Sequence, residues 1–138
     1  MFQKIYSECE QDKLLHIIFN NIEGIKTRVN LSEDKEFLQV MALRENRGKT
    51  FNAHYHVFKK LPILPITQEC LVIIKGSVEC FLYDTDNKLI ANSRISAGDC
   101  VITFYGGHKY KILEDDTLFY EFKNGPYYGQ LDDKVWIT

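Results

Sequence analysis

After Gly24, short runs of mostly apolar residues alternate with clusters of turn residues along most of the chain. Short runs rich in Val, Ile, Phe, Tyr and Thr are separated by clusters of Gly, Asn, Asp and Pro. This pattern is typical of β-strands joined by turns. Many short strands at regular spacing favour an antiparallel sandwich or barrel, so we expect an all-β fold. The strands are predicted at residues 25–31, 36–44, 50–58, 69–75, 77–84, 88–95, 100–104, 108–113 and 117–123.

The segment before Gly24 has a different pattern, which predicts a short N-terminal α-helix over residues 7–20. Ser7 followed by Glu10 fits a capping box at the start of a helix. His16 lies on or beside the apolar face of this helix and is interpreted as a packed histidine. The apolar face is formed by Leu14, Leu15, Ile17 and Ile18.

Residues 58–68 interrupt the strand pattern with the sequence FKKLPILPITQ. Proline has no backbone N–H to donate, so Pro62 and Pro65 exclude a strand in the middle of a sheet. We therefore expect a long loop between the two predicted strands on either side.

The chain has 138 residues, of which 45% are hydrophobic, and this length fits one domain. We expect a single domain over 1–138, with a helical segment at 1–24, a β-barrel at 25–128 and a C-terminal tail at 129–138. A chain of this length buries about two-thirds of its unfolded surface. Because such a core needs no metal or disulfide, a bound ion would serve binding or chemistry rather than folding.

Charge and cysteine content narrow the function classes. The 17 Lys and Arg residues oppose 19 Asp and Glu residues, for a formal net charge of −2, so a nucleic-acid partner is not expected. No apolar run reaches the length of a membrane span, and the N-terminus lacks the pattern of a signal peptide. The four cysteines are widely spread, with no C-x-x-C pair, and are interpreted as buried apolar side chains. We therefore expect a cytoplasmic protein that does not bind membranes.

Three histidines and a glutamate stand out by their spacing. His54 and His56 are two residues apart in a predicted strand, so their side chains point to one face. Glu69 opens the next predicted strand, and His108 begins a later one after two glycines. Imidazoles and a carboxylate on neighbouring strands would form a metal site with open positions, provided that this face is the inside of a closed structure.

The spacing around these residues resembles the first motif of the cupin superfamily, a family of small double-stranded β-helix (jelly-roll) barrels. Gly48 is followed by five residues and the H-x-H pair, and Glu69 is followed by six residues and Gly76. The gap of twelve residues between His56 and Glu69 exceeds the three or four that are usual in the family. The predicted proline-bearing loop accounts for this extra length as an insertion between strands.

The second cupin motif is matched in part. Gly98 and Gly106 match its glycines, His108 comes one residue early, and Phe104 and Ile112 replace its Pro and Asn. The tail sequence EFKNGPY at 121–127 is similar to the ending of a subgroup of small bacterial cupins. These cupins also tend to carry a Gly-Gly-His sequence, and their genes often lie in clusters for surface-polysaccharide sugars.

The resemblance implies that His54, His56, Glu69 and His108 bind a divalent transition metal. Nitrogen and oxygen donors without a thiolate suit Fe, Mn, Ni or Zn, and the spacing does not choose among them. The alternative is a barrel without metal that uses the histidines as acid–base groups or packs them.

Catalysis would also need proton carriers and groups that hold the substrate. Tyr110 shares the parity of His108 and should point into the barrel, although a buried tyrosine also serves packing. Glu121 and Lys123 alternate with aromatic residues, which also suits a solvated outer face. The candidate catalytic residues are Tyr110, Tyr105 and Glu121, and the candidate substrate-binding residues are Arg44, Lys123 and Tyr127.

The expected ligand is a small polar molecule, most plausibly a sugar or nucleotide sugar. The metal site would support isomerase or epimerase chemistry, or dioxygenase chemistry if the ion is Fe(II). The alternatives are a non-catalytic sugar-binding or accessory cupin, and a metal-independent sugar-nucleotide 3,4-ketoisomerase that uses paired His and Tyr residues. Because small cupins commonly pair through edge strands, we also expect a homodimer.

Overall fold

A computed structural model describes residues 2–20, 22–52, 56, 66–125, 129 and 134–137. The described chain is almost entirely β-structure, with one short 3₁₀ turn at Ile22–Gly24 and no α-helix. The strands are β1 (Phe2–Tyr6), β2 (Leu14–Phe19), β3 (Arg28–Asn30), β4 (Met41–Leu43), β5 (Glu69–Lys75), β6 (Ser77–Tyr83), β7 (Leu89–Ser96), β8 (Cys100–Thr103), β9 (Gly107–Ile112) and β10 (Leu118–Lys123). The prediction of an all-β chain is confirmed.

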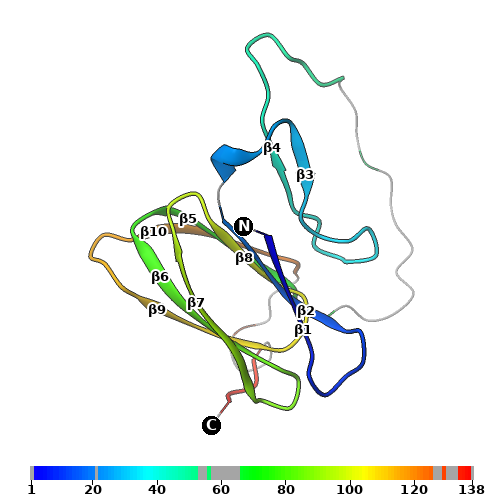
Figure 1. Ribbon diagram of the computed structural model, residues 1–138, viewed down its shortest axis with the longest axis vertical. Helices are drawn as coiled ribbons and strands as arrows, with labels where there is room; N and C mark the ends of the chain where they lie inside the picture. The colour runs from blue at the N-terminus through cyan, green and yellow to red at the C-terminus, as the bar shows by residue number, and fades with distance from the viewer. Residues whose placement is uncertain are drawn as a thin grey trace.

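The strands form three antiparallel sheets (Figure 1). The largest has five strands in the order β1-β2-β8-β5-β10, and we call it sheet A. A three-stranded sheet, sheet B, has the order β7-β6-β9, and β3 pairs with β4 in a hairpin. Sheets A and B pack face to face and do not close into a barrel among the described strands. The jelly-roll topology therefore stays a prediction.

The main core lies between sheets A and B. Sheet A contributes alternate residues of each strand to this face, and sheet B contributes the inward residues of β6 and β7. Such alternation is the period of two expected for packed sheets. The buried side chains of this core are Ile5, Ile18, Leu71, Ile73, Val78, Cys80, Leu82, Ile95 and Val101.

A second core covers the opposite face of sheet A. The segment that contains the 3₁₀ turn and the β3–β4 hairpin packs against this face with Ile25, Leu31 and Ala42. Both faces of the central strands are therefore buried, and all six residues of β2 and all four of β8 are buried. A strand that is covered on both sides has a continuous apolar sequence rather than an alternating one.

The predicted N-terminal helix over residues 7–20 is wrong, because this segment is a turn followed by β2. The run from Leu14 to Phe19 is apolar on both strand faces, and such a run resembles the apolar face of a helix in sequence. The capping-box pattern marks a real hydrogen bond, since the Ser7 hydroxyl accepts from the backbone N–H of Glu10 at 2.8 Å. Here this bond closes the loop between β1 and β2 rather than a helix.

The strands predicted beyond residue 68 are confirmed within one or two residues. The predictions at 25–31 and 36–44 are too long, because only the short strands β3 and β4 form there. Of the predicted strand at 50–58, residues 50–52 and 56 are not in a strand, and the others lie outside the described residues. The proline-bearing loop also lies largely outside them.

The cysteine interpretation holds for three of the four residues. Cys70, Cys80 and Cys100 are buried in the cores, whereas Cys9 is exposed. Burial raises the pKa of Cys80 to about 12, so its thiol stays protonated and packs as an apolar group. In the described part of the chain, no helix has the length and apolar character needed to cross a membrane.

Candidate functional site

A row of polar side chains crosses sheet A at one end of the main core. Strand register places Lys123 opposite Glu69, Glu69 opposite Thr103, and Thr103 opposite His16. Directly opposed residues of antiparallel strands share one face, so all four side chains lie on the same side of the sheet. That side faces sheet B, where the rest of the core is apolar. We call these four residues the polar row.

Sheet B supplies two further side chains, from β9. His108 Nε2 lies 3.3 Å from Glu69 Oε1, and the Tyr110 hydroxyl donates to the same oxygen at 3.4 Å. The rings of His108 and Tyr110 stack with their centroids 5.0 Å apart. Three residues that the sequence analysis selected, Glu69, His108 and Tyr110, are therefore brought into contact.

Burial controls the ionisation of this group. Glu69 is 6% exposed, and its burial raises the pKa of the carboxyl, while the neighbouring His108 and Lys123 oppose the shift. Burial also raises the pKa of Tyr110 well above 10, and the nearby Glu69 carboxylate raises it further. Tyr110 is therefore a protonated phenol near neutral pH and can act as a hydrogen-bond donor.

The Glu69–His108 pair fits two ligands of one divalent ion. Two donors that each lie about 2.1 Å from an ion are separated by roughly 3.0 to 3.4 Å in octahedral or tetrahedral geometry. The observed separation of 3.3 Å falls in this range. In addition, His108 Nδ1 is buried and has no hydrogen-bond partner among the described residues. If Nε2 binds an ion, Nδ1 carries the ring proton, and no described residue accepts that proton.

Two other predicted residues lie beside this pair on β10. Glu121 and Lys123 are on the same strand face, with Lys123 Nζ 3.7 Å from Glu121 Oε1. Both charges act on Glu69, with Lys123 lowering its pKa and Glu121 raising it. They therefore border the site and are not placed on an unrelated outer face.

The remaining predicted residues are not brought to this site within the described chain. Arg44 is exposed and donates to the Ile25 carbonyl at 3.2 Å. Tyr105 lines a separate cavity of about 360 Å³, where the Lys13 ammonium lies 5.0 Å from its ring. His56 is exposed and does not form a group of three metal-ligand atoms with Glu69 and His108. His54 and Tyr127 lie outside the described residues.

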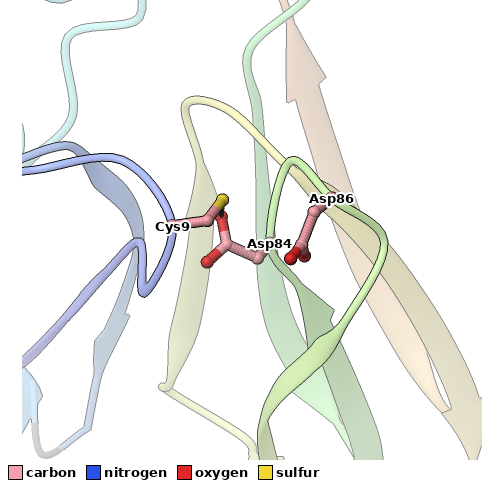
Figure 2. A group of neighbouring side chains, drawn as sticks. All are labelled: Cys9, Asp84 and Asp86. Carbon is pink, nitrogen blue, oxygen red and sulfur yellow. Dashed lines mark hydrogen bonds between the residues drawn. The ribbon is translucent and has the colours of Figure 1, made fainter.

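A second group of possible metal ligands occurs among the described residues. Cys9 from the β1–β2 loop and Asp84 and Asp86 from the β6–β7 turn place their ligand atoms within 4.8 Å of one another (Figure 2). Cys9 and Asp86 are exposed, whereas Asp84 is buried.

The Asp84 carboxylate already has protein donors for both oxygens. It accepts from the Ser7 hydroxyl at 2.7 Å and from the backbone N–H of Glu8 at 2.6 Å and of Thr85 at 2.7 Å. Burial opposes its ionisation, but these hydrogen bonds prevail and hold the pKa of Asp84 well below its usual range. The group therefore acts as a clamp between the β1–β2 loop and the β6–β7 turn.

The sequence analysis did not select Thr103 as a site residue, and it interpreted His16 only as a packed histidine. Both residues belong to the polar row. His16 Nδ1 lies 3.1 Å from the Thr103 hydroxyl, and its Nε2 lies 3.1 Å from the Tyr83 carbonyl oxygen. The two residues are 87 positions apart, and no local motif links them. Only the pairing of β2 with β8 would have revealed this contact.

Comparison with family models, with curated proteins and with solved structures found no match. The site is therefore interpreted from its own geometry, and the cupin resemblance stays a prediction.

Proposed function

We propose that this protein is a metal-binding, cupin-like protein that acts on a small polar molecule such as a sugar or nucleotide sugar. The observation that carries the proposal is the contact between the buried Glu69 and the half-buried His108, whose 3.3 Å separation suits two ligands of one ion. The proposed ligands are His54, His56, Glu69 and His108, and the ion is Fe, Mn, Ni or Zn.

The order of the described strands supports the jelly-roll part of the proposal. The chain crosses between sheets A and B from β5 to β6, from β7 to β8, from β8 to β9 and from β9 to β10. As a result, β8 lies beside β5 in one sheet while β9 lies beside β6 in the other. Two strand pairs that wind side by side in this way are typical of a double-stranded β-helix.

The side chains around the pair suit proton transfer on a polar substrate. Tyr110 holds a proton 3.4 Å from Glu69, and the raised pKa of Glu69 favours its use as an acid or base. Lys123 and Glu121 at the border can hold substrate hydroxyl or phosphate groups. A bound divalent ion would polarise a substrate oxygen, which suits isomerase or epimerase chemistry, and Fe(II) would also permit dioxygenase chemistry.

A second candidate is metal-independent isomerisation of the same class of substrate. The stacked His108 and Tyr110 rings, 5.0 Å apart, favour it, because a His and Tyr pair can move protons without an ion. In this case, Glu69 would orient His108 through their direct contact at 3.3 Å. A non-catalytic sugar-binding or accessory role remains the third outcome.

Metal analysis tests the proposal directly. We expect purified protein to contain close to one divalent ion per chain, and Glu69→Gln and His108→Ala to weaken binding by about tenfold or more while circular dichroism stays unchanged. Glu121→Gln is the matched control, since this carboxylate borders the site without being a proposed ligand. If the wild-type protein binds none of Fe, Mn, Ni and Zn, the proposed metal site is contradicted.

The substrate class is tested with a panel of UDP-, GDP- and dTDP-linked sugars. We expect at least one to raise the melting temperature of the wild-type protein and to be converted to an isomer that NMR detects. Conversion that survives chelation would support the metal-independent candidate, and binding without conversion would support the accessory role. The absence of any shift across the panel would contradict the sugar assignment.

A further inference from the structure

The cavity of about 360 Å³ that Tyr105 lines is not used by the proposed function. Three segments that are distant in sequence form its walls. They are the start of β2 with the loop before it, the segment between β3 and β4, and the turn between β8 and β9. The cavity borders the second core, to which Leu14 belongs and against which Tyr105 packs.

Glu36 places a buried carboxylate in the wall of this cavity, with only 6% of the residue exposed. Its Oε2 accepts from the Gln68 side-chain amide at 2.8 Å, and Gln68 Oε1 accepts from the backbone N–H of Leu38 at 2.8 Å. Among the described residues, the carboxylate has no ion pair and no second hydrogen bond. A carboxylate accepts about four hydrogen bonds, and a buried one is costly without them. Glu36 is therefore held in place by a neutral amide and has acceptor capacity left for a ligand.

Aromatic rings and an ammonium group complete the wall. Phe37 and Tyr105 supply half-buried rings. Lys13 Nζ lies 5.0 Å from the centroid of the Tyr105 ring and donates to both carboxylate oxygens of Glu10 at 2.8 Å. An ammonium has three N–H donors, so Lys13 keeps one for a ligand. The cavity thus combines apolar ring surface with a donor and an acceptor whose positions are fixed.

The charges around the cavity favour a neutral ligand. Lys13 and Lys35 are already paired, with Glu10 at 2.8 Å and with Glu33 at 3.1 Å, while Asp12 and Glu36 add two carboxylates. A phosphate or another anion would therefore be repelled by these carboxylates. A cation would compete with the Lys13 ammonium for the Tyr105 ring.

We propose that this cavity binds a neutral saccharide, whose hydroxyl groups donate to Glu36 and whose C–H face packs on Tyr105 and Phe37. Sugar hydroxyls both donate and accept hydrogen bonds, which matches a carboxylate and an ammonium in one wall. Ligand pockets span about 300 to 1,000 Å³, and this cavity lies near the lower end, which suits a mono- or disaccharide. The inference goes beyond the proposed function, because the cavity shares no lining residue with the Glu69–His108 site.

NMR titration of the isotope-labelled full chain tests the proposal. The probes are glucose, galactose, N-acetylglucosamine and lactose, none of which is charged. We expect at least one of them to shift the amide resonances of Lys13, Glu36 and Tyr105, with a Kd of about 10 mM or below.

Substitutions in the wall separate the cavity from other surfaces. We expect Glu36→Gln and Tyr105→Leu each to raise the Kd about fivefold or more, since one loses a charged acceptor and the other loses the ring. The oxygen of a glutamine at 36 can still accept from Gln68, so the first variant keeps the structural hydrogen bond. Glu79→Gln on β6 and Tyr120→Leu on β10 are the matched controls and should leave the Kd unchanged.

Three outcomes would overturn the proposal. The first is the absence of shifts at the cavity for every neutral sugar up to its solubility limit. The second is a Kd that neither Glu36→Gln nor Tyr105→Leu changes. The third is a response of the cavity to inorganic phosphate or UDP but not to the neutral sugars. The titration is run with a chelator and repeated in Glu69→Gln, so its result does not depend on the proposed metal site.

Discussion

At the scale of single residues, His16 links the stability of the protein to pH. Burial lowers its pKa from 6.5 to about 4 in the folded state, with His108 lowering it further and the Tyr83 carbonyl and Asp84 opposing. The unfolded chain exposes the ring and binds a proton near pH 6.5. Between these two pH values, acid therefore favours the unfolded state.

We expect the His16 contribution to the free energy of unfolding to be complete above pH 6.5 and to fall as the pH drops toward 4. The total loss is about 3 kcal/mol, since each pKa unit corresponds to about 1.4 kcal/mol. Urea denaturation at several pH values measures it as the difference between wild type and His16→Gln. Parallel pH profiles for the two proteins would show that His16 does not carry this dependence.

At Gly106, a positive φ coincides with the close approach of a backbone carbonyl. Its φ is +78°, and an added Cβ would lie 2.4 Å from the Tyr83 carbonyl oxygen. Gly48 has a similar φ of +91° but no atom within 4 Å of the same position. A comparison of alanine substitutions at the two glycines therefore separates the cost of a positive φ from the cost of a steric clash.

We expect Gly106→Ala to lower the free energy of unfolding by more than about 2 kcal/mol, because it adds a backbone clash to the strain of a positive φ. Gly48→Ala should cost only about 1 kcal/mol, which is the strain alone. Thermal and urea denaturation of the two variants give the comparison. Equal losses in both would mean that the turn before His108 relaxes freely.

The sequence allowed part of the site to be predicted at this scale. Glu69, His108 and Tyr110 were found because strand parity and turn glycines assign faces within each strand. Thr103 and His16 were not, because their partners come from strands that are distant in sequence. Local patterns give the face of a residue, whereas register between strands decides its neighbours.

At the scale of elements, the contact between the β1–β2 loop and the β6–β7 turn ties the N-terminal hairpin to sheet B. Asp84 forms this contact with the Ser7 hydroxyl and the backbone of Glu8. Its low pKa means that the ionised carboxylate stabilises the folded state above the ordinary pKa, and that this stabilisation is lost as the pH falls through the folded value.

Asp84→Asn should lower the free energy of unfolding at pH 7 by about 1.5 to 3 kcal/mol, since a buried charged acceptor of several hydrogen bonds is lost. Asp86→Asn is the control, because within the described residues this exposed carboxylate accepts one hydrogen bond, from the Lys88 backbone N–H at 3.0 Å. We expect a change within about 0.5 kcal/mol. Chemical denaturation measures both. Similar effects from the two variants would contradict the clamp.

Elements were predicted well where one strand face is apolar and the turns carry Gly or Asn. Asn87 and Gly98 have positive φ values in turns that the sequence marked, and the flanking strands follow the predicted bounds closely. The prediction failed at 14–19, where burial on both faces removes the alternation that distinguishes a strand from a helix. Neither propensity nor capping reveals that a second layer covers the sheet.

At the scale of the whole molecule, β10 is the last strand of sheet A in the described chain and carries exposed aromatic residues. Tyr120 and Phe122 are 62% and 53% exposed, and their rings lie 6.0 Å apart. Edge strands with apolar side chains are common sites of pairing between copies of a chain. The predicted homodimer is therefore best tested at this edge.

We expect light scattering coupled to size exclusion to give the mass of a dimer for the wild-type protein. A double substitution, Tyr120→Lys with Phe122→Lys, should shift it to the monomer because charges oppose pairing at an edge. Leu89→Lys, at an exposed leucine on the edge of sheet B, should leave the dimer intact. A monomeric wild type at all concentrations would refute the homodimer.

The pairing of β2 with β8 also has a consequence for how the chain is made. The His16–Thr103 contact spans 87 positions, so β2 leaves the ribosome long before its partner on that side is synthesised. Until then, the nascent chain presents six consecutive residues that the finished protein buries. Sheet A can assemble only after most of the chain has been translated, and pairing between strands that are distant in sequence is slow. A chaperone that covers β2 during synthesis would therefore protect the nascent chain from aggregation.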